Sequence, residues 1–504
     1  MLKNRTLYFG DNLEILREKI PDGVFDLIYL DPPFNSNRNY NVLFKEGVQD
    51  SPAQVQAFED SWHWTREAQE VFEELVGVRP SKTKINEQIS NLMQALEKLV
   101  GHNDMLAYLT MMTIRLIELR RVLKSAGSIY LHCDPTASHY LKVVMDVVFE
   151  KQNFLSEIVW CYDTGGRSTS SFPQKHDIIL RYSKTSDANF YYDQVSLPRD
   201  TSTMHEGIFT DDEGRQYQRN IKAGKEYRYY LDKGVLPNDW WSDIQALNPA
   251  AKERLGYPTQ KPEALLERII KASSKEGDWV LDPFCGCGTT VAVAERLKRN
   301  WVGIDITMLA INLMNHRLRD QFGLGRNEMN IDGIPKDLSG ARALFQKDPF
   351  AFEYWALDLV NAVPAQSKTK ENMRGADKGI DGVINFIKDI ENGKQVYGKL
   401  LVQVKGGGTH RNDIATLKGD IERERADGGL FITLEKPTQP MREEAVSSGS
   451  YDVKFSKAKF PKIQIITVEE LLNGKKPEVP LIALPYYKEA KAVKVESKNT
   501  GLGI

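Results

Sequence analysis

The chain has 504 residues, a formal net charge of −2, and 41% hydrophobic and 27% charged residues. This composition excludes a disordered or collagen-like chain, and the length predicts two to four domains. The near-zero net charge argues against indiscriminate polyanion binding, but leaves open a nucleic acid held in one basic cleft. No apolar run reaches the roughly 20 residues of a membrane span and the first residues lack a signal-peptide core, so we expect a soluble, cytoplasmic protein with no membrane partner. None of the four cysteines forms a C-x-x-C pair, which argues against structural zinc.

The N-terminal third predicts alternating strands and helices. Residues 25–30, FDLIYL, form a buried strand that ends at Asp31-Pro32-Pro33, where two prolines stop further ladder pairing. Apolar residues three and four apart predict helices from Ser51 to about Lys124, of which residues 51–105 form a helical insertion. Further along lie a strand, a helix and two strands, at about 128–134, 139–150, 154–161 and 176–183. Such alternation is typical of an α/β fold.

Residues 186–256 show no long amphipathic period and read as an inserted segment. Regularity returns with a helix at 262–272 and a complete strand–loop–helix–strand unit at 279–305. A linker at about 333–340 precedes a second domain, predicted over 341–484, with strands at 382–387 and 399–405. The lysine-rich end, 485–504, is predicted to be a flexible tail.

A glycine-containing loop follows the strand at 279–282, in the stretch DPFCGCGTT from Asp282 to Thr290. Glycines let the backbone approach a ligand, and the helix beginning near Thr289 points free N–H groups at it. The fingerprint G-x-G-x-x-G lacks its third glycine and no phosphate loop is present, which disfavours a dinucleotide. Asp305 ends the next strand, near the spacing at which an acid reaches a ribose. A nucleoside without pyrophosphate, with S-adenosylmethionine as the candidate, fits best; an ordinary tight turn is the alternative.

The turn Asp31-Pro32-Pro33-Phe34 offers a carboxylate and a proline-fixed carbonyl as neighbouring acceptors, followed by an aromatic ring. Two acceptors suit the exocyclic amine of a nucleobase, whose lone pair is otherwise delocalised into the ring. Such a base must leave the duplex stack to be reached, and Phe34 is placed to stack on it. The alternative is that this turn only ends a strand.

In this order, DPPF, YPTQKP and DPFCGCGTT resemble the β-group amino-methyltransferases of DNA. The resemblance covers residues 5–316, including GDNLEIL, GSIYLHCDP and HDIILRYSKT. It implies a Rossmann-like α/β methyltransferase domain over residues 1–335 that uses S-adenosylmethionine. It implies that Asp11 and Asp305 contact the adenosine part of the cofactor. The residues implied to hold the rest of the cofactor are Asp31, Thr259, Gln260, Lys261, Asp282, Phe284, Gly286, Gly288 and Thr289, and those implied to hold the target amine are Asp31, Pro32, Pro33 and Phe34.

The sequence also bears on the target base. Methylation of cytosine at carbon 5 needs a thiolate, which the family that does it presents after a proline, and this chain has no Pro-Cys dipeptide. Methylation of cytosine N4 remains open, although relatives with that target usually begin the tetrapeptide with serine. Asp31 therefore favours adenine N6.

A basic, tyrosine-rich stretch, RQYQRNIKAGKEYRYY, lies within the inserted segment. Its basic residues suit phosphates and its tyrosines suit bases, which are the ingredients of a DNA reader. By the resemblance, residues 186–256 are the target-recognition region, with double-stranded DNA as the partner. A solvated, charged hairpin with packed tyrosines is the alternative. The predicted DNA-binding residues are Arg215, Arg219, Lys222, Lys225 and Arg228.

The second domain carries Asp381 before one predicted strand and Gln403 and Lys405 on one face of the next. A carboxylate and an amide oxygen can hold Mg²⁺, and a lysine can orient the attacking water. Asp381, Gln403 and Lys405 resemble the core of Mrr-type PD-(D/E)xK nucleases over about residues 348–435, which implies an α/β restriction-endonuclease-like domain. Glu353 is a further candidate metal ligand.

The primary hypothesis is a restriction–modification enzyme: a site-specific adenine-N6 DNA methyltransferase fused to a Mg²⁺-dependent endonuclease. The alternatives are a non-catalytic, DNA-binding C-terminal domain, cytosine-N4 specificity, and a non-enzymic DNA-binding subunit of a defence complex. A homodimer or further restriction-system subunits remain open as partners.

Overall fold

The computed structural model describes most of the chain. The described residues are 2–33, 39–46, 49–59, 62–163, 169–199, 207–248, 250–255, 257, 259–325, 328–365, 379–391, 394–454 and 458–480, with the backbone alone for 39–46, 49–59, 394 and 395. Phe34 of the predicted target-binding turn and the predicted tail, 485–504, lie outside these residues. Within them, no helix is both long enough and apolar enough to cross a membrane.

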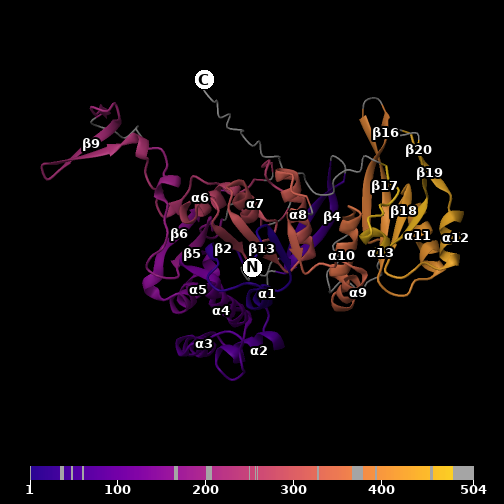
Figure 1. Ribbon diagram of the computed structural model, residues 1–504, viewed down its shortest axis with the longest axis horizontal. Coiled ribbons are helices and arrows are strands. Elements are labelled where there is room, and N and C mark those ends of the chain that lie inside the picture. Colours follow the sequence, from indigo (N-terminus) through magenta and orange to yellow (C-terminus); the bar gives the residue numbers. More distant parts are fainter. Residues whose placement is uncertain are drawn as a thin grey trace.

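A nine-stranded sheet forms the centre of the N-terminal part (Figure 1), in the order β11-β6-β7-β5-β2-β12-β13-β1-β14. Neighbouring strands are parallel except where β7 pairs with β5 and β6. The strands are β1 (Thr6–Phe9), β2 (Phe25–Leu30), β5 (Leu123–Cys133), β6 (Phe154–Cys161), β7 (His176–Ser183), β11 (Trp240–Trp241), β12 (Trp279–Asp282), β13 (Asn300–Asp305) and β14 (Asn330–Asp332). The predicted strands at 25–30, 154–161 and 176–183 are confirmed.

Helices cover both faces of this sheet. Ile28 and Leu30 of β2 pack with α1 (Asn12–Lys19), α4 (Asp104–Val122) and α5 (Pro135–Val148), whereas Leu27 and Tyr29 pack with α6 (Glu263–Ser273), α7 (Thr289–Arg296) and α8 (Met308–Phe322). A parallel strand that is buried on both faces needs apolar residues at nearly every position, which is why FDLIYL has no polar alternation. The result is the predicted Rossmann-like α/β fold.

The predicted helical insertion is wrong over its first residues. Residues 51–59 belong to strand β4 (Gln49–Glu59), which pairs in antiparallel fashion with β3 (Asn39–Glu46). The helices of the insertion begin later, with α2 (Arg66–Leu75) and α3 (Glu87–Val100). Thr65 and Asn86 cap them through side-chain oxygens, which fixes where each helix starts. Apolar residues three and four apart therefore predict helices correctly only in the stretches that follow the capping residues Thr65 and Asn86.

The inserted segment forms an arm that projects at the upper left of Figure 1. Its tip is a three-stranded sheet in the order β10-β9-β8. The strands are β8 (Phe209–Thr210), β9 (Gln216–Lys222) and β10 (Lys225–Tyr230), and two 3₁₀ turns, η2 (Tyr192–Gln194) and η3 (Leu231–Lys233), lie along the segment; a third, η1 (Lys151–Asn153), precedes β6. The basic stretch is thus a hairpin, and we call β9 and β10 together the ribbon.

The C-terminal part is a separate α/β unit with a five-stranded sheet, β15-β16-β17-β18-β21. Helices α9, α10 and α13 contribute to the hydrophobic core on one face and α11 and α12 to that on the other, which fits a restriction-endonuclease-like domain. The bounds are α9 (Leu338–Lys347), α10 (Pro349–Leu359), β15 (Val363–Pro364), β16 (Gly382–Glu391), β17 (Lys394–Lys405), α11 (Arg411–Arg423), β18 (Gly428–Thr433), α12 (Gln439–Ser447), β19 (Ser450–Val453), β20 (Ala458–Pro461), β21 (Ile463–Thr467) and α13 (Val468–Leu472).

The two parts meet where α8 packs on α10. His316 Nε2 lies 3.0 Å from Asp358 Oδ1, and both side chains are about nine-tenths buried. The amide of Asn312 donates to the carbonyl of Tyr354 over 3.5 Å. Met308 also joins the hydrophobic core of the C-terminal part.

Candidate active site

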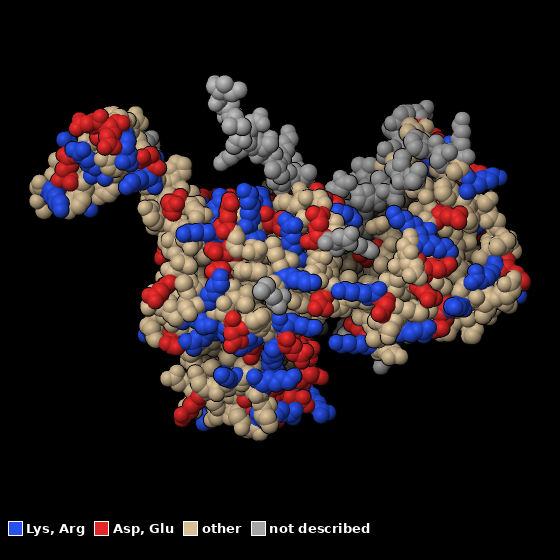
Figure 2. Space-filling view, in the orientation of Figure 1, with Lys and Arg blue, Asp and Glu red and all other residues tan. Residues whose placement is uncertain are grey.

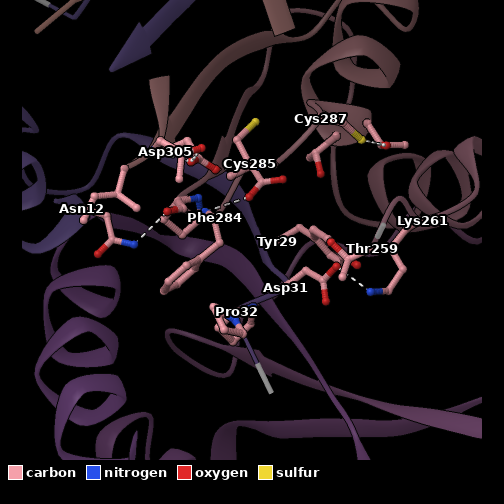
Figure 3. Close-up of a pocket in the computed structure, with 18 of the residues that line it drawn as sticks. Asn12, Tyr29, Asp31, Pro32, Thr259, Lys261, Phe284, Cys285, Cys287 and Asp305 are labelled. Carbon is pink, nitrogen blue, oxygen red and sulfur yellow. Dashed lines mark hydrogen bonds and ion pairs between the residues drawn. The ribbon is translucent and has the colours of Figure 1, made fainter. Parts of the chain in front are cut away.

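A cavity of about 220 Å³ opens at the carboxyl ends of the parallel strands (Figure 3). Four neighbouring strands, β2, β12, β13 and β1, each end at or just before an acid: Asp31, Asp282, Asp305 and Asp11. All four acids line the cavity. In an open α/β sheet, ligands bind in this crevice, where the direction of strand order reverses.

The predicted residues gather here although they are far apart in the chain. Asp31 and Gly286 line the same cavity, as the arrangement of the two motifs requires. The predicted residues that line it are Asp11, Asp31, Pro32, Pro33, Thr259, Gln260, Lys261, Asp282, Phe284, Gly286, Thr289 and Asp305. Gly288 is not a lining residue, although its neighbours Cys287 and Thr289 are, and Phe34 is outside the described residues.

The glycine loop needs its glycines for space and for backbone conformation. Gly286 and Gly288 have φ values of +51° and +74°. A Cβ at Gly288 would lie 2.6 Å from Met314 Cγ, so a side chain there would have to displace the Met314 side chain of α8. The buried guanidinium of Arg317 donates to the carbonyl of Cys287 over 3.3 Å and to Glu263 over 2.7 Å, which ties the loop to α6.

Asp305 and Asp282 are carboxyls in different settings, since Asp282 is buried and Asp305 is half-buried. Asp305 Oδ2 accepts from Gly286 N over 2.8 Å, and Oδ1 accepts from the backbone and hydroxyl of Thr307. Burial raises the pKa of Asp305, while these bonds favour its charged form. Asp282 accepts from Phe284 N over 3.0 Å, and burial raises its pKa to about 7. Asp282 is thus poised to change charge near neutral pH.

Arg115 on α4 is a cavity residue that the sequence motifs do not reveal. Its guanidinium donates to both oxygens of Asp11, at 2.8 and 3.1 Å, and to Asn12 Oδ1 at 2.6 Å. Asp11 also caps α1 by accepting from Leu13 N. Burial lowers the pKa of Arg115 and the Asp11 carboxylate opposes that change. No local pattern signals this pair, because its two members are 104 positions apart.

Asp31 forms an ion pair with Lys261, whose Nζ lies 2.6 Å from Asp31 Oδ2, and both side chains are largely buried. Figure 3 shows the pair at the edge of the cavity near Thr259. The neighbouring Gln260 stabilises the preceding loop, because its amide donates to the carbonyl of Glu253 and accepts from Leu255 N. Lys261 therefore joins the predicted cofactor side of the cavity to its predicted target side.

A buried chain of hydrogen bonds runs behind Asp31. Tyr29 Oη lies 2.8 Å from His132 Nδ1, and His132 Nε2 lies 3.0 Å from Asp177 Oδ2. Although burial opposes it, the bond from His132 lowers the pKa of Asp177. The charged Asp177 makes Nε2 the donor, so Nδ1 accepts from Tyr29. Tyr29 lines the cavity, and this chain fixes its ring there.

The predicted basic residues of the arm lie far from the cavity, on or beside the ribbon. Arg215 pairs with Asp232 at 2.8 Å, and Arg228 pairs with Glu226 at 2.8 Å. Arg219 stacks over Phe209. Lys222 and Lys225 are exposed opposite each other at the end of the hairpin. Figure 2 shows the arm with basic and acidic side chains mixed on the visible face.

In the C-terminal part, Asp381 precedes β16, and Gln403 and Lys405 lie on β17, its partner strand, as predicted. Asp381 Oδ2 accepts from Val404 N over 2.6 Å. Gln403 is buried, and its Oε1 has no hydrogen-bond partner among the described residues. Glu353 lies on α10 and is half-buried. Among the described residues, no group of three or more His, Cys, Asp or Glu side chains is arranged to hold a metal ion.

The sheet order, the glycine loop and the acids at four strand ends define a Rossmann-like α/β domain with a cavity at the carboxyl ends of its strands. Residues 25–316 match the family model described as DNA methylase, which is more than half of the chain. The chain belongs to this DNA methylase family. Residues 365–473 match a second model, described as NACHT-associated inactive Restriction Endonuclease 1.

Two curated relatives illustrate the match. The Type II methyltransferase M.HpaI of Haemophilus parainfluenzae is 32% identical over 224 residues, which are 44% of this chain and 63% of that protein. The chain thus spans less than two thirds of that relative. The DNA adenine methyltransferase YhdJ of Escherichia coli (strain K12) is 27% identical over 315 residues, covering 62% of this chain and 82% of YhdJ.

Solved structures resemble the chain only loosely. The cytosine-N4-specific PvuII DNA methyltransferase gives a TM-score of 0.36 at 14% identity, over 62% of this chain and 86% of that one. The complex of M1.HpyAVI with SAM gives a TM-score of 0.32 at 16% identity, over 62% and 98%. The family assignment rests on the sequence match alone.

Proposed function

We propose that the chain transfers a methyl group from S-adenosylmethionine to N6 of adenine in double-stranded DNA. The observation that carries this proposal is one cavity lined by both Asp31-Pro32-Pro33 and the Asp282–Gly286 loop. Membership of the DNA methylase family supports methyl transfer to DNA. The name of YhdJ, an adenine methyltransferase, supports the choice of base.

The chemistry of the cavity fits S-adenosylmethionine. Its walls offer backbone N–H groups at the start of α7, the Phe284 ring and carboxylates at four strand ends. Asp11 and Asp305 are the proposed partners of the adenosine part, and Asp282, Phe284, Gly286 and Thr289 those of the methionine end. When bound, S-adenosylmethionine supplies a methyl group on an electrophilic sulfonium.

Asp31 is the proposed partner of the target amine. Its Oδ2 is held by Lys261 at 2.6 Å, which leaves Oδ1 to accept a hydrogen from the amine. The ammonium group of Lys261 holds the Asp31 side chain in place, and the negative charge of Asp31 stabilises the positive charge that grows on the amine nitrogen during attack. Lys261 is thus a positioning residue for Asp31. Tyr29, fixed by His132, shapes the wall beside this carboxylate.

The test is transfer of labelled methyl groups to duplex DNA, followed by analysis of the modified nucleosides. The wild-type protein should yield N6-methyladenine, and Asp31→Ala should lose at least about a hundredfold in rate, because one oriented acceptor contributes a few kcal/mol. Asp187→Ala, at an exposed aspartate outside the cavity, is the matched control. N4-methylcytosine as the product would contradict the base assignment. Equal labelling by wild type and Asp31→Ala would contradict the site, and no labelling would favour a non-enzymic DNA-binding subunit.

We propose as a second activity that the C-terminal domain cuts DNA with Mg²⁺. One specific observation favours it: the buried Oε1 of Gln403 has no partner among the described residues, beside the strand that Asp381 precedes. Asp381, Gln403 and Glu353 are the proposed metal ligands, and Lys405 the group that orients water. The family model that matches this domain is described as inactive. The competing proposal is therefore a domain that binds DNA without cutting it.

The test of the second activity is Mg²⁺-dependent cutting of unmethylated plasmid. Lys405→Ala should abolish the cutting, whereas Lys459→Ala, at an exposed lysine of β20, should leave it intact. Cutting that survives Lys405→Ala would refute the assigned site. No cutting by the wild-type protein, together with retained DNA binding, would establish the competing proposal.

A further inference from the structure

The two faces of the ribbon differ in chemistry. In an antiparallel pair, residues directly opposite each other point to the same face, and successive residues alternate. The register therefore divides the ribbon into two sets. We call the first set the arginine face; it comprises Tyr217, Arg219, Ile221, Glu226, Arg228 and Tyr230. We call the second the amide face; it comprises Gln218, Asn220, Lys222, Lys225, Tyr227 and Tyr229.

The arginine face is occupied by contacts within the arm. Tyr217 lies between Phe209 and Tyr230, with ring centroids 5.9 and 5.7 Å away. The guanidinium of Arg228 lies 4.9 Å from the Tyr217 ring centroid, and that of Arg219 lies 4.6 Å from the Phe209 centroid. These arginines cover an aromatic row that holds β8, β9 and β10 together.

The amide face presents polar groups outward. Asn220 is exposed opposite the half-exposed Tyr227, and Lys222 is exposed opposite Lys225. Among the described residues, the side chains of Gln218 and Asn220 are engaged in no hydrogen bond. The face carries two ammonium groups and no carboxylate, whereas on the arginine face Glu226 neutralises Arg228. Uncompensated positive charge and an exposed amide therefore coincide on one side of the ribbon.

We propose that the amide face enters the major groove of duplex DNA, where Lys222 and Lys225 contact phosphates and Asn220 reads the edge of a base. This inference rests on the proposed function and adds the face that sets sequence specificity. The major groove is about 12 Å wide and admits a two-stranded ribbon. Carboxamides form bidentate hydrogen bonds with adenine there, and lysine ammonium groups neutralise phosphates.

The first experiment maps methylated positions in DNA from cells that express each full-length variant. Asn220→Ala should lower methylation at the wild-type sequence about ten- to a hundredfold, or admit a second base at one position of it. Ile221→Ala, at the exposed neighbour on the arginine face, should keep the wild-type sequence preference. If Ile221→Ala changes the sequence preference, or Asn220→Ala leaves it intact, the assignment of the reading face is wrong.

The second experiment measures DNA binding by the purified protein at several salt concentrations, without requiring catalysis. Loss of one phosphate contact reduces the slope of log Kd against log salt by about 0.9. Lys222→Ala should therefore reduce the slope, whereas Lys298→Ala, before the amino end of β13, should not. An unchanged slope for Lys222→Ala would overturn the inference. A reduced slope in a protein that transfers no methyl group would refute the proposed function and support the ribbon's role.

Discussion

At the scale of single residues, the cavity depends on carboxyl groups that the fold buries in different ways. Asp305 accepts from the backbone of Gly286 and Thr307, Asp31 is paired with Lys261, and Asp282 accepts from the backbone of Phe284. The three carboxyl groups thus have different electrostatic surroundings within one site. Two of these settings lead to measurable consequences.

The buried carboxyl of Asp282 predicts a characteristic dependence of stability on pH. Its pKa is about 7 in the folded chain against 3.8 as the ordinary value, so the folded state binds the proton more tightly. That stabilisation is complete below about pH 4 and is lost as the pH rises through 7. Asp282→Asn removes this pH-dependent stabilisation. The Tm of the variant minus that of the wild type should therefore increase from pH 5 to pH 8. The full pKa displacement corresponds to about 4 kcal/mol of free energy of unfolding. A difference in Tm that does not vary with pH would contradict this prediction.

The Asp31–Lys261 pair predicts how a change at Lys261 divides between kcat and KM. Lys261→Gln should lower kcat for methyl transfer about ten- to a hundredfold, because Asp31 loses the partner that orients it. The KM for S-adenosylmethionine should change less than threefold, and Lys261→Arg should restore part of kcat. Steady-state kinetics on one duplex checks this. A rise in KM alone would instead assign Lys261 to cofactor binding, the role that the family resemblance implies.

At the scale of elements, Arg115 joins the start of α1 to the middle of α4. Arg115 is almost wholly buried, whereas about a third of the Asp11 side chain is exposed. Removing Asp11 therefore leaves the guanidinium of Arg115 buried without its carboxylate partner. Removing Arg115 leaves the Asp11 carboxylate, which water can reach. Loss of Asp11 should therefore lower the free energy of unfolding more than loss of Arg115.

This asymmetry predicts the order of two variants. Asp11→Ala should destabilise the protein by about 3 kcal/mol or more, because Arg115 is stranded and α1 loses its cap. Arg115→Met should have a smaller effect, about 1–2 kcal/mol, because its chain still fills the space. Thermal unfolding compares the two, and Asp22→Ala, at an exposed aspartate, is the control. The reverse order would show that the pair does not behave as a buried ion pair.

At the scale of the whole molecule, the two α/β units meet through α8 and α10. The buried His316–Asp358 pair is the polar centre of that contact. Asp358→Asn should weaken it, so the amide hydrogens of α10 should exchange with deuterium several-fold faster. Asp452→Asn, at an exposed position of β19, serves as the comparison. Unchanged exchange in α10 would show that apolar packing alone holds the units together.

Much of this architecture could be predicted from the sequence because its signals are local. FDLIYL followed by two prolines predicts a buried strand and its end, and the glycine loop predicts the start of α7 at Thr289. The helix predicted over 51–59 is wrong, since the pairing of this stretch with β3 is tertiary and leaves no trace in helical spacing. The same holds for Arg115 with Asp11 and for His132 with Tyr29, which become neighbours only when the sheet forms. The division of the ribbon into faces required the cross-strand register.

Helix α8 extends from the wall of the cavity to the contact between the two α/β units. Its first residue follows Thr307, which holds Asp305 in the cavity wall, and its later turns carry His316 against Asp358. Its 15 residues make a rod of about 22 Å. Because a helix is a stiff element, the residues at its two ends keep a fixed distance from each other. One helix therefore begins beside the residue that holds Asp305 and ends against the C-terminal unit.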